Sequence, residues 1–229
     1  MTSDTIGKTA SLAAITPRPR IDVCLPSKER FGPANAGAIS GVVLDQIRSS
    51  ATPDCFRVVG TQVDRPFEGV RFLGLRPRHA WLHGSNIGLA QAYLRSLRGM
   101  PLPDLVEVHS RCHVARHIKA KRPDLRVALY LHNDPRDMKG SRTIAERRSL
   151  LGLMSAVICV SDYIRGCFLD GLADAGELAN KVSTARNGAT RWLTKPARKR
   201  PMILLAGRMV PEKGILECAK AMATILQDH

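Results

Sequence analysis

The sequence predicts an α/β protein with a doubly wound, Rossmann-like parallel sheet. Short apolar segments rich in β-branched residues alternate with segments of helical periodicity, and there is no internal repeat. Strands that are buried on both faces appear as continuous apolar runs, and their alternation with helices favours parallel pairing. The expected strands cover residues 21–25, 56–60, 69–75, 104–109, 125–132, 156–160 and 181–185.

Helices are expected between these strands because apolar residues recur there every three or four positions. The two clearest sets are Ile39, Val42, Val43 and Ile47, and Ile87, Ala90, Leu94 and Leu97. A serine that follows a strand and precedes a helical pattern is typical of a helix N-cap. Ser161 stands in such a position, so capping explains it without a catalytic role.

The composition indicates a globular, strongly basic protein. The chain has 229 residues, 44% of them hydrophobic, and a formal net charge of +15, so it can bury a core and attract polyanions of several kinds. Aromatic residues make up only 4% of the chain, which disfavours stacking on nucleobases, and we expect no specific nucleic-acid partner. The basic surface between residues 111 and 148 has two interpretations, a solvated face or a face that rests on an anionic membrane surface.

The location of the protein is inferred from its cysteines and its apolar runs. Six cysteines without a Cys-x-x-Cys pair suit a reducing compartment, so no disulfides are expected. The first twenty residues contain no signal-peptide core, and no apolar run reaches the length of a membrane span. We expect a cytoplasmic protein with a flexible segment at residues 1–20. A peripheral position on the inner face of the membrane stays open.

Candidate ligand-binding residues follow the expected strands, because ligands of open parallel sheets bind beyond the carboxyl ends of the strands. His109 ends one strand, and His132 with Asn133 follows the next. Gly37 precedes a helix that is expected to begin near Ala38. Backbone N–H groups there could approach an anionic ligand, although an ordinary strand-to-helix connection explains the loop equally well.

Histidines that recur every four residues suggest a metal site. His109, His113 and His117 have the spacing of zinc ligands on a helix. However, His109 is expected to end a strand, which leaves His113 and His117 on a polar helix face. We therefore expect no metal and no cofactor.

A second domain is expected to begin near residue 201. Asn187 and Gly188 form a turn signal, and the following stretch is basic and without periodicity. The predicted organisation is an N-terminal domain at residues 21–190, a basic linker at 191–200, and the first strand and helix of a second domain at 201–229. Only 23 residues follow Ala206, too few for a core of their own, so this second domain is expected to be incomplete.

This order of elements, followed by the motif GRMVPEKG at residues 207–214, resembles the group 1 or family 4 retaining glycosyltransferases. These enzymes have two Rossmann-like domains in the arrangement called GT-B. The resemblance covers most of the chain from Ile21 onward. It implies that Arg208 and Lys213 bind the diphosphate of a nucleotide-sugar donor. Fixed cations at a helix N-terminus stabilise the charge that develops on the leaving diphosphate.

The resemblance also assigns roles in the first domain. Asp104 to His109 matches the family's strand whose final histidine lies at the reacting centre, and His132 and Asn133 stand where contacts to the acceptor or the sugar are expected. Of the family's paired glycines only Gly37 is present. The acidic pair of the family lies in a region that this sequence does not contain.

The function implied is the transfer of a sugar, with retention of configuration, from a nucleotide-sugar donor to a glycan or lipid-linked acceptor. Bacterial polysaccharide or lipopolysaccharide assembly is the expected setting. The alternative is a non-catalytic remnant of such an enzyme that binds an acceptor or a membrane. Residues 1–229 alone are not expected to transfer sugar.

Overall fold

The computed structural model describes residues 18–77, 80–188, 202–207 and 209–228. The chain divides into two compact units, residues 1–190 and residues 191–229, and each is described by itself. Three features of the sequence lie outside the described residues: most of the N-terminal segment that is expected to be flexible, the basic linker and Arg208.

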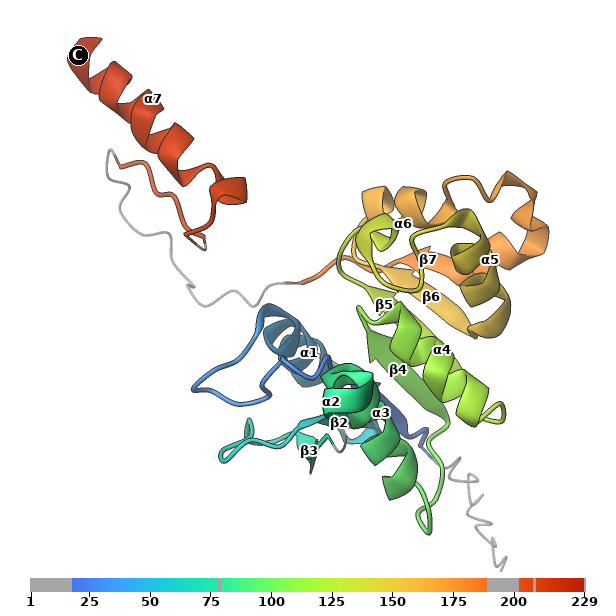
Figure 1. Cartoon of the computed structure of the whole chain (residues 1–229). Helices are drawn as coiled ribbons and strands as arrows, with labels where there is room; N and C mark the ends of the chain where they lie inside the picture. Colours follow the sequence, from blue (N-terminus) through green and yellow to red (C-terminus); the bar gives the residue numbers. More distant parts are fainter. Residues whose placement is uncertain (1–17, 78–79, 189–201, 208, 229) are drawn as a thin grey trace, which may run out of the picture. The chain divides into compact units, whose positions relative to one another are not determined.

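The first unit is built on one parallel sheet of seven strands in the order β3-β2-β1-β4-β5-β6-β7 (Figure 1). Each strand falls within or overlaps a segment predicted from the sequence, so the seven predicted strands are confirmed. The order reverses between β1 and β4, which lie side by side although two strands separate them in the chain. The strands are β1 (Ile21–Cys24), β2 (Phe56–Thr61), β3 (Arg71–Leu75), β4 (Leu105–His109), β5 (Val127–Leu131), β6 (Ala156–Cys159) and β7 (Val182–Thr184).

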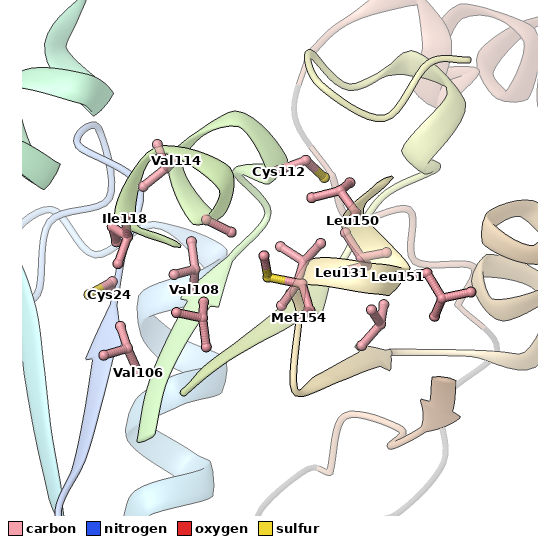
Figure 2. Packing of buried hydrophobic residues seen from close by; sticks show 14 of the residues in the cluster. Cys24, Val106, Val108, Cys112, Val114, Ile118, Leu131, Leu150, Leu151 and Met154 are labelled. Atoms are coloured by element: carbon pink, nitrogen blue, oxygen red, sulfur yellow. The ribbon is translucent and has the colours of Figure 1, made fainter. Parts of the chain in front are cut away.

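Helices cover both faces of the sheet, so the doubly wound fold is confirmed. On one face, Val43 and Ile47 of α1 pack with Val23 of β1. On the other face, residues of α3 to α6 form the larger core, which includes Val106 and Val108 of β4, Ile118 of α4 and Leu150 of α5 (Figure 2). The helices are α1 (Ala38–Arg48), α2 (Ala80–His83), α3 (Ser85–Ser96), α4 (Cys112–Lys121), α5 (Ile144–Leu153) and α6 (Asp162–Leu169).

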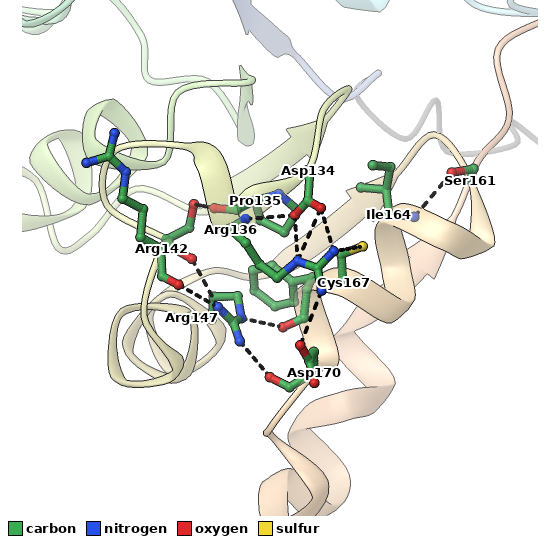
Figure 3. Close-up of polar contacts among 11 residues, drawn as sticks. Asp134, Pro135, Arg136, Arg142, Arg147, Ser161, Ile164, Cys167 and Asp170 are labelled. Carbon is green, nitrogen blue, oxygen red and sulfur yellow. Dashed lines mark hydrogen bonds and ion pairs between the residues drawn. The ribbon is translucent and has the colours of Figure 1, made fainter.

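Ser161 caps α6 as the sequence predicts. Its side-chain oxygen accepts a hydrogen bond from the backbone N–H of Ile164 at 3.2 Å (Figure 3), which satisfies one of the N–H groups that have no partner within the helix. A second helix start is fixed by a capping box, in which Thr143 and Glu146 bond each other's backbone N–H groups at the beginning of α5. These caps define the first residues of α5 and α6, the helices that follow β5 and β6.

The second unit contains the helix α7 (Ile215–Asp228). The strand expected from residue 201 is not formed at residues 202–207. Met202, Ile203 and Leu204 are 68%, 68% and 81% exposed. A β-strand requires a neighbour for its N–H and C=O groups, and no strand pairs with this segment within the described chain. The apolar composition of this segment therefore does not predict a strand by itself.

No helix in the part of the chain that the structure describes is long and apolar enough to cross a membrane.

The core between α5 and the sheet should dominate the stability of the first unit. Leu150 is completely buried, whereas Leu153 on the same helix is 39% exposed. Leu150→Ala should lower the free energy of unfolding by about 2–5 kcal/mol, because it removes buried contacts and leaves a cavity. The matched variant Leu153→Ala should cost less than about 1 kcal/mol. Urea unfolding followed by circular dichroism measures both, and equal losses would contradict this packing.

Candidate functional site

The pairing of β4 with β5 brings the predicted site residues together at the carboxyl edge of the sheet. In this register His109 lies beside Tyr130, and Glu107 lies beside Ala128. Side chains two residues apart in a strand point to the same face. Glu107 and His109 therefore share the face on which Tyr130 lies, and His132 follows just beyond the end of β5.

His109 is the centre of a chain of three hydrogen-bonded side chains. Its Nε2 lies 2.6 Å from a carboxylate oxygen of Glu107, and its Nδ1 lies 2.8 Å from Nε2 of His132. An ionised carboxylate only accepts hydrogen bonds, so Nε2 of His109 carries a proton. The direction of the bond between the two imidazoles depends on the protonation of both rings. His109 thus connects His132 to Glu107.

The exposure of these groups determines which of them a ligand can reach. The sequence predicts that His109 itself points into the crevice, but the structure buries this residue completely and uses both of its ring nitrogens. His132 is partly exposed, and Asn133 beside it is exposed. A ligand can therefore reach the imidazole of His132, and the hydrogen bond with His109 orients this ring.

The electrostatics favour a neutral His132. Burial, and then the neighbouring His109, lower the pKa of His132 to about 4, because a second positive charge beside another imidazole in a desolvated place is costly. At neutral pH the Nδ1 atom of His132, which is not used in the bond to His109, can form a hydrogen bond with a ligand. His132, oriented by His109, can therefore form a hydrogen bond with a hydroxyl group of a ligand.

Aromatic stacking and an unusual backbone turn hold the two histidines in place. The rings of His109 and Tyr130 stack at 4.8 Å with an interplanar angle of 5°, and the Tyr130 hydroxyl accepts from Gln46 of α1 at 2.9 Å. Ser110 has a positive φ of 48°, a conformation that costs energy for a side-chain-bearing residue. Its hydroxyl accepts from the backbone N–H of His132 at 3.2 Å. This turn joins the ends of β4 and β5.

The loop that follows β5 is fixed by an ion pair. Arg136 donates to both carboxylate oxygens of Asp134 and reaches Asp170 at 3.4 Å (Figure 3). The hydrogen bonds from the Arg136 side chain lower the pKa of Asp134 to about 2, so this carboxylate stays charged at neutral pH. The pair anchors the loop immediately after His132 and Asn133.

A buried arginine ties the other end of the same loop to α6. Arg147 is 2% exposed and donates to the backbone carbonyls of Arg142, Phe168 and Asp170 (Figure 3). A buried guanidinium is tolerated when its donors are satisfied. Arg147 belongs to the basic segment between residues 111 and 148, so part of that charge has an internal structural role and does not lie on a surface.

The N-terminus of α1 is occupied by a side chain of the protein itself. Gly37 is the N-cap residue, and the backbone N–H of Ser40 donates to the Glu29 carboxylate at 3.3 Å. A Cβ at position 37 would lie 1.8 Å from the same carboxylate. The sequence leaves two interpretations open for Gly37, a loop that admits a ligand or an ordinary strand-to-helix connection, and in the structure Gly37 makes room for Glu29. The carboxylate takes the position that favours an anion.

A polar pocket of about 730 Å³ opens beside this helix at the carboxyl ends of β1 and β2. Arg30 and Arg65 supply donors, Asp64 supplies an acceptor, and Asn35 and Gln62 supply both. Gly32 lets the two loops cross, because a Cβ there would lie 2.3 Å from the carbonyl oxygen of Arg65. Sequence reasoning missed this pocket because it depends on loops that are distant in the chain.

The remaining sequence candidates are placed as follows. His113 and His117 lie on α4, while His109 ends β4, so the three do not share a helix. Within the described ranges, no group of three or more metal-binding side chains could hold an ion. Lys213 ends a short turn just before α7 and is exposed, and Gly214 after it has a positive φ of 64°. Lys213 therefore lies at a helix N-terminus, while its partner Arg208 is not described.

Comparisons with known proteins give a limited picture. No protein-family model matches the chain, and no curated protein matches it. Anabaena HepE, solved in complex with UDP-glucose, is similar at 15% identity and a TM-score of 0.45, over 74% of this chain and 44% of that one. UDP-N-acetylglucosamine 2-epimerase from Rickettsia bellii is similar at 13% identity and a TM-score of 0.45, over 74% and 45% of the two chains.

The chain thus spans less than half the length of these solved structures. Their identities and TM-scores are low, so the fold is established by the strand order of the sheet and not by these likenesses.

The low pKa of His132 predicts a pH-dependent contribution to stability. The folded value is about 4, and the unfolded value is about 6.5. Folding thus favours the neutral form of His132. The contribution of this residue to the free energy of unfolding is therefore complete above about pH 6.5 and is lost as the pH falls toward about 4. NMR titration of the imidazole resonances measures the pKa directly.

His132→Gln should make unfolding less sensitive to pH in this window, whereas His83→Gln, at an exposed position, should not. A His132 pKa near the ordinary value would contradict the geometry described here.

The contact between Glu29 and Gly37 predicts a coupled pair of substitutions. Gly37→Ala should destabilise the protein by about 1 kcal/mol, because the carboxylate must leave the helix N-terminus. In a Glu29→Ala background the same change should be nearly neutral, since φ of −78° at Gly37 suits alanine. Urea unfolding of the four proteins gives the coupling energy. Additive losses would show that the two residues do not interact.

Proposed function

We propose that this chain contains the acceptor-side domain of a GT-B glycosyltransferase together with the beginning of its donor-binding domain. The enzyme would transfer a sugar from a nucleotide-sugar donor to a glycan or lipid-linked acceptor. The observation that supports this best is the His132–His109–Glu107 chain at the carboxyl end of β4. That position lies next to the reversal of strand order between β1 and β4, where ligands of such sheets bind.

The arrangement suits binding and orientation of sugar hydroxyls. A neutral His132 offers one ring nitrogen for a hydrogen bond, and the exposed Asn133 offers an amide donor and an acceptor. Glu107 holds His109, and His109 holds His132, so the accessible ring meets a substrate in one orientation. In this proposal His109 acts at the reacting centre through His132.

The donor diphosphate would be bound by Arg208 and Lys213. Cleavage of the sugar–phosphate bond leaves negative charge on the nucleoside diphosphate, and cations beside a helix N-terminus stabilise it as it forms. Arginine supplies a bidentate fork and lysine a compact charge. The exposed Lys213 before α7 is consistent with this role. Retention of configuration is part of the proposal and rests on the family resemblance.

The acceptor would lie in the polar pocket between the loops that follow β1 and β2. Its mixture of arginine, aspartate and amide side chains suits a ligand with many hydroxyl groups. A lipid-linked acceptor would bring the protein to an anionic membrane surface, which the net charge of +15 favours. We propose bacterial polysaccharide or lipopolysaccharide assembly as the setting.

The proposed roles predict the activity of variants of the longest protein that the gene encodes. Lys213→Ala and His132→Ala should each lower the rate of sugar transfer by roughly a hundredfold, because each removes a contact made to the reacting groups. Lys220→Ala removes the same charge from an exposed position on α7 and should leave the rate unchanged. Transfer is measured with radiolabelled UDP-, GDP- and ADP-sugars and isolated lipid-linked acceptors.

The same assay separates the two candidate functions. Acceptor binding without transfer by any form of the protein would favour the non-catalytic remnant. Transfer that is unaffected by both Lys213→Ala and His132→Ala would contradict the assignment of the site. Robust transfer by residues 1–229 alone would contradict the expectation that this chain is inactive by itself.

A further inference from the structure

A second pocket lies between α3 and α4, at the end of these helices that is far from the candidate site. Its volume is about 280 Å³. α4 begins just after His109 and runs back along the sheet, so its C-terminal end lies at the amino edge of the strands. The pocket is lined by Gln91, Leu94, Arg95, Arg98, His117, Lys121 and Arg122.

The lining contains four basic side chains and no acidic one. Arg122 is paired with Asp124, which it contacts at 2.8 Å. Arg95, Arg98 and Lys121 make no ion pair with the described residues. Like charges that converge on one hollow repel each other, and an anion bound among them relieves this repulsion. Three positive charges are therefore available to a ligand.

A histidine in the wall of the pocket has an unsatisfied nitrogen. The Nε2 atom of His117 is buried and has no hydrogen-bond partner in the described structure. Burial, and then Lys121 and the nearby His83, lower the pKa of His117. Because this nitrogen has almost no accessible surface, His117 forms part of the wall of the pocket, and the charged side chains provide the contacts for a ligand.

The types of donor indicate the chemistry of the ligand. Arg95 and Arg98 can each offer a planar fork of two N–H groups, and such forks match the oxygens of a phosphate group. Lys121 adds a compact charge, and Gln91 adds an amide donor. Leu94 supplies an apolar part of the wall, so the pocket is not a uniformly solvated surface.

We propose that this pocket binds a phosphate group, carried either by a lipid headgroup or by a free phosphorylated molecule. The inference is independent of the proposed glycosyltransferase activity, because its residues lie at the opposite end of α4 from His109. The pocket also gathers part of the positive charge of residues 111–148 in one place. Four other basic residues of that segment bond groups of the first unit: Arg116, Lys119, Arg147 and Arg148. In the pocket, Lys121 and Arg122 meet two arginines from α3 and the turn after it, Arg95 and Arg98.

The test is a titration of residues 1–229 with inorganic phosphate and with pyrophosphate at constant ionic strength. Calorimetry gives the affinity, and the ring resonances of His117 report binding in the pocket itself. In the variant Arg95→Gln/Arg98→Gln, affinity should fall about tenfold or more and the His117 shifts should disappear, because two charge-assisted contacts are lost. The single variant Lys121→Gln should weaken binding in the same direction if the double variant folds poorly.

The matched control is Lys139→Gln/Arg142→Gln, which removes the same charge from exposed positions in the loop after β5. Its affinity should stay within about twofold of the parent protein, because screened charges at a distance contribute little. Equal loss in both double variants would show that net charge alone attracts the phosphate and would overturn the proposal. Unchanged binding in Arg95→Gln/Arg98→Gln and in Lys121→Gln would overturn it as well.

Vesicles distinguish the two sources of the phosphate group. Sedimentation with vesicles of phosphatidylglycerol, compared with vesicles of phosphatidylcholine, measures headgroup binding. Vesicle binding that is lost in Arg95→Gln/Arg98→Gln but kept in the control assigns the pocket to a lipid headgroup. Pocket-dependent binding of phosphate or pyrophosphate without vesicle binding assigns it to a free phosphorylated molecule.

Discussion

The pairing of β4 with β5 is the constraint on which the candidate site depends. Because His109 lies beside Tyr130 in this register, the two rings stack, and His132 at the end of β5 comes within hydrogen-bonding distance of His109. A slip of one residue would turn Glu107 and His109 toward the opposite face of the sheet. Val106 and Val108, which alternate with Glu107 and His109 along the strand, belong to the core on the face that α3 to α6 cover, so burial of that core fixes the position of the polar chain on the other face.

The surroundings of the site explain how a buried polar group can persist there. His109 is completely enclosed, and this is tolerated because Glu107 and His132 satisfy both of its nitrogens. The loop beyond His132 is then anchored at two points, by the pair of Arg136 with Asp134 and by the carbonyl contacts of Arg147. The accessible imidazole is thus held on a rigid support, as a site for oriented binding requires.

The sequence predicted the strands well because parallel strands buried on both faces are continuous apolar runs. The same reasoning placed His109 and His132 at strand ends. It could not identify Glu107 as the partner of His109, because that contact depends on the rotamers of two side chains on the same face of β4. It also could not distinguish the buried Arg147 from surface charges, or foresee that Glu29 lies against Gly37. The strand expected from residue 201 is not formed at residues 202–207, because strand pairing is a tertiary property that composition does not contain.

The most direct test of the central claim is the protonation of the two imidazoles in residues 1–229, measured by long-range ¹H–¹⁵N correlation spectra at neutral pH. The hydrogen-bonded chain requires a proton on Nε2 of His109, where it faces Glu107, and a neutral His132. The substitution Glu107→Ala should remove the preference of the His109 proton for Nε2 and alter the spectrum of His132 as well. A mixture of tautomers at His109 in the parent protein, or a His132 spectrum unaffected by the loss of Glu107, would contradict the account.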